Sequence, residues 1–280
     1  MNDDTRAHLS FSASTPTPAR IYDYYLGGKD NFSADREAGE RVMRVFPQAP
    51  TLALANRAFL LRVVRYCVQA GIDQFIDLGT GIPTSPNVAE VACAFNPSVR
   101  VIGVDNDPVV LSHQRAHPSS TPGGYTIVEG DVRRPWAILA DPRLNEVIDL
   151  SRPVAVLCVA VLHFVPDADD PAGILDTFAD AMTAGSYLAV SAVTSTDTDP
   201  AVITQIEDAY KNASAPLIFR TADQILSWFD PLDLVHPGLL DVSQWPTGIG
   251  VPTDVRILGA LARKRWRAHT SRTRPAGGAG

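Results

Sequence analysis

The residues best suited to chemistry stand in one stretch, residues 74–83, where a short apolar run ends in Asp77 and two glycines follow. The apolar run predicts a buried parallel strand, and the glycines predict a tight turn before a helix that begins near Asn87. Gly79 and Gly81 suit such a turn, because a side chain there would block a ligand's approach to the backbone or require a disfavoured positive φ. The amides of the turn would face the carboxyl end of the strand, where open α/β sheets bind ligands.

The spacing within this turn separates two classes of cofactor. The dinucleotide fingerprint needs a third glycine three residues after the second, and Thr84 stands at that position. An acid two residues before the first glycine is instead typical of sites for S-adenosyl-L-methionine (SAM). In such a site Asp77 would lie near the amino group of the methionine moiety, and Gly79 and Gly81 would make room for the nucleoside. An ordinary strand-to-helix turn explains the same residues, so the turn alone leaves both interpretations open.

Acidic residues also follow two further predicted strands. The strand 99–104 is followed by Asp105, which is placed to accept hydrogen bonds from two ribose hydroxyls. The strand 125–128 is followed by Asp131, which could accept from the adenine amino group while the Val132 amide donates to a ring nitrogen. Because parallel strands end at one edge of a sheet, three acids in this order favour the SAM site.

A tyrosine-rich segment, residues 20–32, precedes the sheet and ends a predicted helix at Gly27 and Gly28. It fits an amphipathic helix packed on the domain, and it also fits a cap whose polar end closes over a ligand. The candidates for contact with the methionine end or the methyl acceptor are Tyr22, Tyr25, Lys29 and Asn31.

A histidine follows the most apolar predicted strand, residues 154–161, beside the place where the methyl group of SAM would project. His163 is therefore a candidate general base, since an unperturbed imidazole has a pKa of about 6.5. A histidine that is held by backbone groups at the strand edge is the other interpretation. The acids at 167–170 are typical of a solvated loop and a helix cap.

Composition limits the remaining classes. The chain has 280 residues, of which 45% are hydrophobic and 20% charged, as in one soluble α/β domain with additions. No apolar run approaches the roughly 18 residues of a membrane span, and the acidic N-terminus lacks a signal core, so we expect a cytoplasmic protein. The net charge of −7 disfavours nucleic acid as a partner. The three cysteines are scattered, and no cluster has metal-ligand spacing, so no catalytic metal is expected.

Four motifs together resemble a bacterial SAM-dependent methyltransferase family that was long catalogued as a domain of unknown function. They are residues 20–32, 77–84, 104–108 and 161–167, and the resemblance covers roughly 19–262. It implies an α/β, Rossmann-like class I methyltransferase fold with a seven-stranded sheet, six strands parallel and the last antiparallel, and helices on both faces. It gives the cofactor and the reaction type but not the acceptor. The expected cofactor-binding residues are Asp77, Gly79, Gly81, Asp105, Asn106, Asp131 and Val132.

The expected organisation has four parts: a disordered N-terminus (1–18), a helical cap (19–70), the SAM-binding domain (71–262) and a basic disordered tail (263–280). The expected function is methyl transfer to an oxygen or nitrogen atom of a small molecule. Two alternatives stay open. One is a protein that binds SAM without turnover, and the other is a nicotinamide-dependent reductase, which the missing third glycine disfavours.

Overall fold

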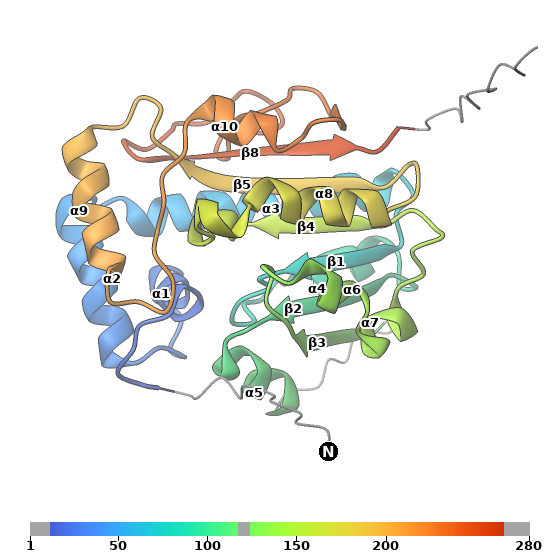
Figure 1. Cartoon of the computed structure of the whole chain (residues 1–280), viewed down its shortest axis with the longest axis horizontal. Helices are drawn as coiled ribbons and strands as arrows, with labels where there is room; N and C mark the ends of the chain where they lie inside the picture. The colour runs from blue at the N-terminus through green and yellow to red at the C-terminus, as the bar shows by residue number, and fades with distance from the viewer. Residues whose placement is uncertain (1–11, 117–123, 266–280) are drawn as a thin grey trace, which may run out of the picture.

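The strands form one mixed sheet in the order β3-β2-β1-β4-β5-β8-β6, with the short β7 paired to β8 off this path (Figure 1). The computed structural model describes residues 12–116 and 124–265. β1 to β5 pair in parallel, and β8 runs antiparallel to its neighbours. The seven-stranded path with its antiparallel strand is the expected fold, and β7 adds an eighth strand. The bounds are β1 Gln74–Leu78, β2 Arg100–Asp105, β3 Tyr125–Glu129, β4 Ala155–Val159, β5 Tyr187–Thr194, β6 Asp233–Leu234, β7 Leu240–Asp241 and β8 Arg256–Arg263.

Helices cover both faces of the sheet, and each face has its own apolar core. One core receives side chains from α1 Pro18–Tyr25, α2 Ser33–Val45, α3 Ala49–Gln69, α4 Val88–Phe95, α5 Pro108–Ala116 and α9 Pro200–Tyr210. The other receives them from α6 Pro135–Leu139, α7 Pro142–Val147, α8 Pro171–Ala181 and α10 Ala222–Ser227. The central strands β1 and β5 are buried along their whole length, which is why neither sequence alternates apolar and polar residues.

Local sequence signals fix where the main helices begin. Asn87 caps α4 by accepting from the Glu90 amide, and the Glu90 side chain accepts from the Asn87 amide. The same reciprocal arrangement joins Thr221 and Gln224 at the start of α10, as their spacing predicts. Capping therefore places α4 directly after the glycine turn.

The N-terminal helices form a cap beside the carboxyl ends of the parallel strands, where α1 and α2 lie next to α9 (Figure 1). The cap begins earlier than residue 19, because Thr17 caps α1 and its backbone amide donates to Asp35. At the other end, β8 continues to Arg263, so the tail begins later than expected. The rest of the expected N-terminal and C-terminal disordered segments, 1–11 and 266–280, lies outside the described residues. Among the described helices, none has both the length and the apolar composition that a membrane span needs.

Candidate functional site

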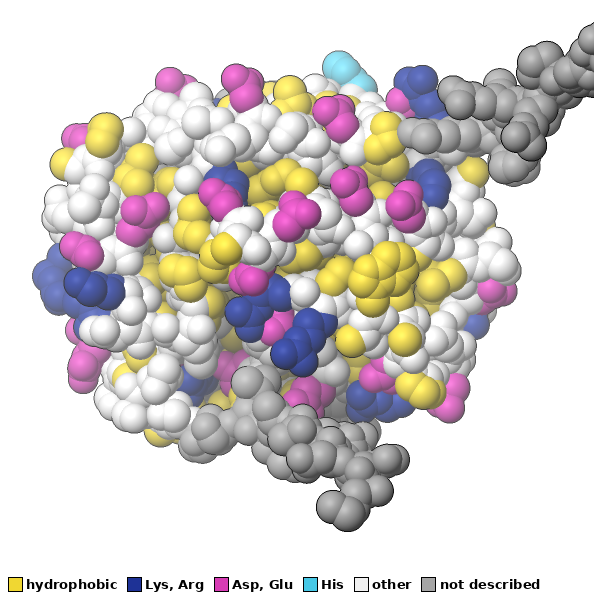
Figure 2. Space-filling view, viewed as in Figure 1, with side chains coloured by type: hydrophobic (Ala, Val, Ile, Leu, Met, Phe, Trp, Pro, Cys, Tyr) yellow, Lys and Arg dark blue, Asp and Glu magenta, His cyan; other side chains and the backbone are white. Residues whose placement is uncertain are grey.

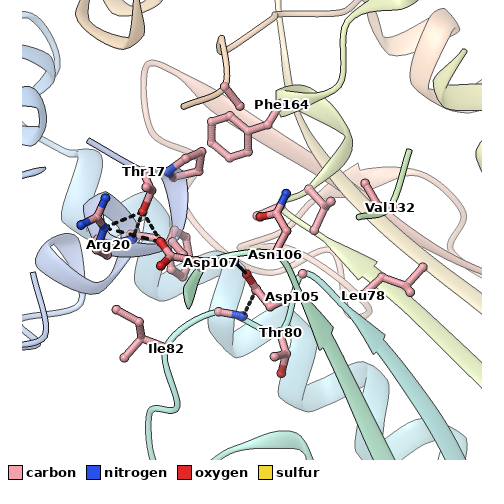
Figure 3. Close-up of a pocket in the computed structure, with 18 of the residues that line it drawn as sticks. Thr17, Arg20, Leu78, Thr80, Ile82, Asp105, Asn106, Asp107, Val132 and Phe164 are labelled. Carbon is pink, nitrogen blue, oxygen red and sulfur yellow. Dashed lines mark hydrogen bonds and ion pairs between the residues drawn. The ribbon is translucent and has the colours of Figure 1, made fainter. Parts of the chain in front are cut away.

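A cavity of about 520 Å³ lies at the carboxyl edge of the sheet, beneath the N-terminal cap. Its floor is formed by the loops that follow β1, β2, β3 and β4, and α1 and α3 supply the wall opposite. Figure 3 shows side chains from these loops converging on the cavity, with Phe164 facing them from the segment after β4. All seven expected cofactor-binding residues line it: Asp77, Gly79, Gly81, Asp105, Asn106, Asp131 and Val132.

The glycine turn has the conformation that its sequence predicts. Gly79 and Gly81 have φ of 65° and 69°, in the left-handed region that favours glycine. A Cβ atom on Gly79 would overlap Cγ2 of Val161, whereas a Cβ on Gly81 would meet no atom within 4 Å. Gly79 is therefore required both by its backbone angle and by close packing against the loop after β4.

This difference gives a matched pair of variants. Alanine costs a similar backbone penalty at either position, but at Gly79 it also overpacks against Val161. We expect Gly79→Ala to lower the free energy of unfolding by about 1–3 kcal/mol more than Gly81→Ala does. Urea unfolding of the two variants and the wild type measures this, and equal losses would contradict the role given to Val161.

Asp105 connects the acidic loop to the glycine turn. One carboxylate oxygen accepts from the Gly81 amide at 2.8 Å, and the other accepts from the Asp107 amide at 2.9 Å. Figure 3 shows the first of these bonds reaching across from the glycine turn to the end of β2. The carboxylate is thus held in one orientation at the edge of the cavity before any ligand binds.

Asp77 and Asp131 lie on either side of Asp105. Asp77 is buried at the end of β1 and accepts from the Thr80 hydroxyl at 2.8 Å. Asp131 receives bidentate hydrogen bonds from the Arg133 guanidinium, which also lines the cavity. Burial alone would raise the pKa of Asp131, but the hydrogen bonds from Arg133 outweigh it and lower the pKa. Asp131 therefore stays ionised and able to accept a further hydrogen bond.

A buried ionic cluster ties the cap to the acidic loop. The Arg20 side chain is 2% exposed, and its Nε lies 3.4 Å from an Asp107 oxygen and 3.5 Å from an Asp35 oxygen. The Thr17 hydroxyl donates to Asp107, and Arg20 also donates to the carbonyl of Thr15 (Figure 3). Asp107 also caps the next helix, since it accepts from the Val109 amide. The arginine that starts the tyrosine-rich motif thus fixes the cap over the cofactor loop.

Tyr22 is the one expected cap residue that lines the cavity. Its hydroxyl donates to the Ala53 carbonyl at 2.9 Å and accepts from the Asn56 amide at 3.1 Å. The Asn56 oxygen accepts from Ser191 on β5, and the Ser191 hydroxyl oxygen accepts from the Ala160 amide. A chain of hydrogen bonds therefore runs from α1 through α3 to the ends of β4 and β5. The sequence did not single out Asn56 for this role.

The other three expected cap residues lie away from the cavity lining. The Asn31 amide donates to the Asp23 carboxylate and to the Gly28 carbonyl, so it holds the loop after α1 in place. Lys29 is exposed, and the pKa of Tyr25 is raised by burial and by the neighbouring Tyr210. These positions suit cap packing rather than ligand contact.

His163 also lies outside the lining of the cavity. It sits in a 3₁₀ turn, Leu162–Phe164, whose tight winding points successive side chains in different directions. Phe164 faces the cavity, while the His163 ring is buried and packs against the Phe164 ring. Burial and the nearby Arg220 lower the pKa of His163 to about 3, so the imidazole is neutral and a weak base at pH 7. The expected role as general base does not fit this position.

The comparisons with known proteins agree with this geometry. The model of a family described as S-adenosyl methyltransferase matches residues 4–265. The chain belongs to the S-adenosyl methyltransferase family. No curated protein matches the chain.

Solved structures show the same relationship. A DUF574 family protein from Streptomyces avermitilis MA-4680 is 40% identical, with 90% of this chain and 98% of that chain covered and a TM-score of 0.85. A proposed methyltransferase from Thermobifida fusca YX is 36% identical, with 90% and 96% covered and a TM-score of 0.82. An O-methyltransferase family protein from Burkholderia thailandensis is 11% identical, with 87% and 64% covered and a TM-score of 0.50, and this likeness shows the fold alone. The expected family and cofactor are thus confirmed.

The site fits the cofactor of an S-adenosyl methyltransferase. Asp105 offers an oriented carboxylate to a ribose, Asp131 and Val132 border the neighbouring space where a base would lie, and the glycine turn leaves its backbone open. Asn106 is exposed between them, and its side chain points into the space beside Asp105 (Figure 3). Among the described residues, no cluster of three His, Cys, Asp or Glu side chains could hold a metal ion.

Cofactor binding and stability should depend on pH in opposite directions. Burial raises the pKa of Asp77 and of Asp105 from 3.8 to about 6. Because these values are raised in the folded state, both groups stabilise the unliganded protein most below about pH 4, and this contribution is lost as the pH rises through about 6. The ionised carboxylates are the forms that accept hydrogen bonds from a ligand. The affinity for S-adenosylhomocysteine (SAH) should therefore rise through about pH 6 and level off above about pH 7.

Calorimetric titration with SAH from about pH 5 to about pH 8 measures this dependence. The Asp105→Asn variant removes one of the two titrating groups and should show a shallower rise. An affinity that is independent of pH in the wild type would contradict the assignment of both acids to the site.

Proposed function

We propose that this protein transfers the methyl group of SAM to an oxygen or nitrogen atom of a small molecule. The observation that carries the proposal is the cavity that joins the acidic edge of the sheet to the space beneath α1 and α3. Its volume of about 520 Å³ lies within the range of roughly 300–1,000 Å³ that is usual for small-ligand pockets. Residues 214–216 and the first described residues, from Ser12 onward, complete the lining.

The surroundings favour a small acceptor over a nucleic acid. Five aspartates and three arginines line the cavity, so it does not offer a polyanion a basic track. Figure 2 shows acidic and basic side chains interspersed on the face in view, rather than one continuous basic surface. The segment before α1 also closes on the loop after α9, since the Ser214 amide donates to the Pro16 carbonyl. These features support an acceptor that is enclosed as a whole.

When bound, SAM supplies an electrophilic methyl group on a sulfonium centre. The chain's own contribution is to orient the partners and to exclude water, which are the main protein effects available to such a transfer. Asp105 and the glycine turn hold the cofactor, and Tyr22, Leu60 and Phe164 wall the space that remains beside it. We assign no general base, because His163 lies outside this space.

Methyl transfer can be tested before the acceptor has been identified. SAM with an isotopically labelled methyl group is incubated with the protein and, separately, with the small-molecule and the macromolecular fractions of a bacterial extract. We expect SAH and a labelled compound to form in the small-molecule fraction, and neither to form with the Asp105→Ala variant. Label in protein or nucleic acid would overturn the small-molecule proposal, and SAM binding without SAH in either fraction would indicate a protein that binds the cofactor without turnover.

A further inference from the structure

Arg57 differs from the other two arginines of the cavity in its partners. Arg20 pairs with Asp35 and Asp107, and Arg133 pairs with Asp131. Across the two described stretches, no carboxylate lies within the 4.0 Å of an ion pair with Arg57. Carboxylates neutralise the charges of Arg20 and Arg133. The positive charge of Arg57 at the cavity wall is not neutralised in this way by any described carboxylate.

The hydrogen bonds of Arg57 leave most of its donors unused. Its Nη2 donates to the Thr84 carbonyl and, at 2.7 Å, to the Pro86 carbonyl. Both bonds use the same nitrogen, and a guanidinium carries five N–H donors in a planar fork. Nε and Nη1 keep unused N–H donors, so either nitrogen can still donate a charge-assisted hydrogen bond to a carboxylate. The carbonyl bonds fix the guanidinium next to the glycine turn.

The strand order shows which part of the cofactor would reach Arg57. Asp105 and Asp131 follow β2 and β3, so an adenosine held by them lies over that half of the sheet. The amino-acid end then extends past the glycine turn toward β1 and α3. Asp77 lies at the end of β1, and Arg57 projects from α3 into the same cavity. The two are close enough that Asp77 counteracts the lowering of the Arg57 pKa by burial.

We propose that Arg57 completes the subsite for the α-amino-acid end of SAM by binding its carboxylate, next to Asp77, whose place near the amino group is typical of SAM sites. A partly buried cation beside a buried anion complements a zwitterion, and it discriminates against adenosine compounds that lack the amino acid. The inference rests on the cofactor of the proposed function and not on methyl transfer itself.

The test compares SAH with 5′-methylthioadenosine, which shares the adenosine but lacks the amino-acid end. Calorimetry measures both ligands against the wild type, Arg57→Met and the control Arg133→Met. We expect Arg57→Met to weaken SAH binding by about 10- to 100-fold and to change methylthioadenosine binding by less than about threefold. Arg133 lies on the adenosine side, so Arg133→Met should weaken the binding of both ligands by the same factor. Equal losses for both ligands in Arg57→Met would reduce Arg57 to a clamp on the 84–86 loop, and unchanged SAH binding would overturn the proposal.

A second comparison starts from two ligands of the wild-type protein. Wild-type protein should bind decarboxylated SAH about 10- to 100-fold more weakly than SAH. The Arg57→Met variant should bind the two compounds with equal affinity. Arg57→Lys keeps the charge but loses the guanidinium nitrogens that bond to the 84–86 loop, and it should fall between wild type and Arg57→Met. Wild-type protein that binds SAH and its decarboxylated form equally would overturn the proposal. These titrations need no turnover, so they separate the failure of this subsite from the failure of methyl transfer.

Discussion

Asp105→Ala is expected to weaken the binding of SAM and SAH by about 100-fold or more. The carboxylate is buried, is oriented by the amides of Gly81 and Asp107, and faces the space assigned to the ribose. Two hydrogen bonds from ribose hydroxyls to a charged acceptor contribute about 1.5–3 kcal/mol each, and a factor of 100 corresponds to about 2.7 kcal/mol. Isothermal titration calorimetry of the variant and the wild type measures the loss directly.

Glu129 provides the matched control for this prediction. It pairs with Asp105 across β2 and β3, so it also stands at a strand end, but it is exposed and lies outside the cavity lining. Glu129→Ala should leave the affinity for SAH unchanged. If Asp105→Ala kept an affinity within about threefold of the wild type while folding normally, the ribose assignment would be wrong.

Arg20→Met is expected to produce the largest loss of stability, about 3–5 kcal/mol in the free energy of unfolding. The substitution leaves the carboxylates of Asp35 and Asp107 without their buried cation, and breaking a buried pair by removing one partner costs far more than an exposed pair contributes. It also removes the hydrogen bond to Thr15 that holds the segment before α1. Urea unfolding monitored by circular dichroism gives the measurement.

An exposed ion pair serves as the comparison. Arg143 contacts Asp141 at 2.7 Å, but the Arg143 side chain is 57% exposed. Arg143→Met should therefore change the free energy of unfolding by at most about 1 kcal/mol. Equal losses in Arg20→Met and Arg143→Met would show that the cluster beneath the cap does not fix the N-terminal segment.

The cofactor edge could be predicted from the sequence because topology alone determines it. Once apolar runs alternate with helices, the residues at the carboxyl ends of β1 and of the later parallel strands must meet at one edge. Asp77, Asp105 and Asp131 all line the cavity at this edge for this reason. The glycine spacing then separated a SAM site from a dinucleotide site, and the family match agrees with that choice.

The residues around this edge could not be predicted in the same way. The pairing of Arg20 with Asp107 joins segments that are distant in sequence, and no local pattern specifies such a contact. The sequence did mark this position, because Arg20 is the first residue of the tyrosine-rich segment. The residues of that segment predicted to contact the ligand did not include Arg20. For His163 the sequence predicted the position of the segment after β4. It could not predict the direction in which each side chain of the 3₁₀ turn points.

The central claim is that the cofactor lies in this cavity with its ribose at Asp105. A crystal structure of the protein with SAH tests it most directly. We expect both ribose hydroxyls within hydrogen-bond distance of the Asp105 carboxylate, the adenine beside Asp131 and Val132, and the amino-acid end between Asp77 and Arg57. SAH bound elsewhere, or bound here with its adenosine toward α3 and its amino-acid end over β3, would contradict the claim.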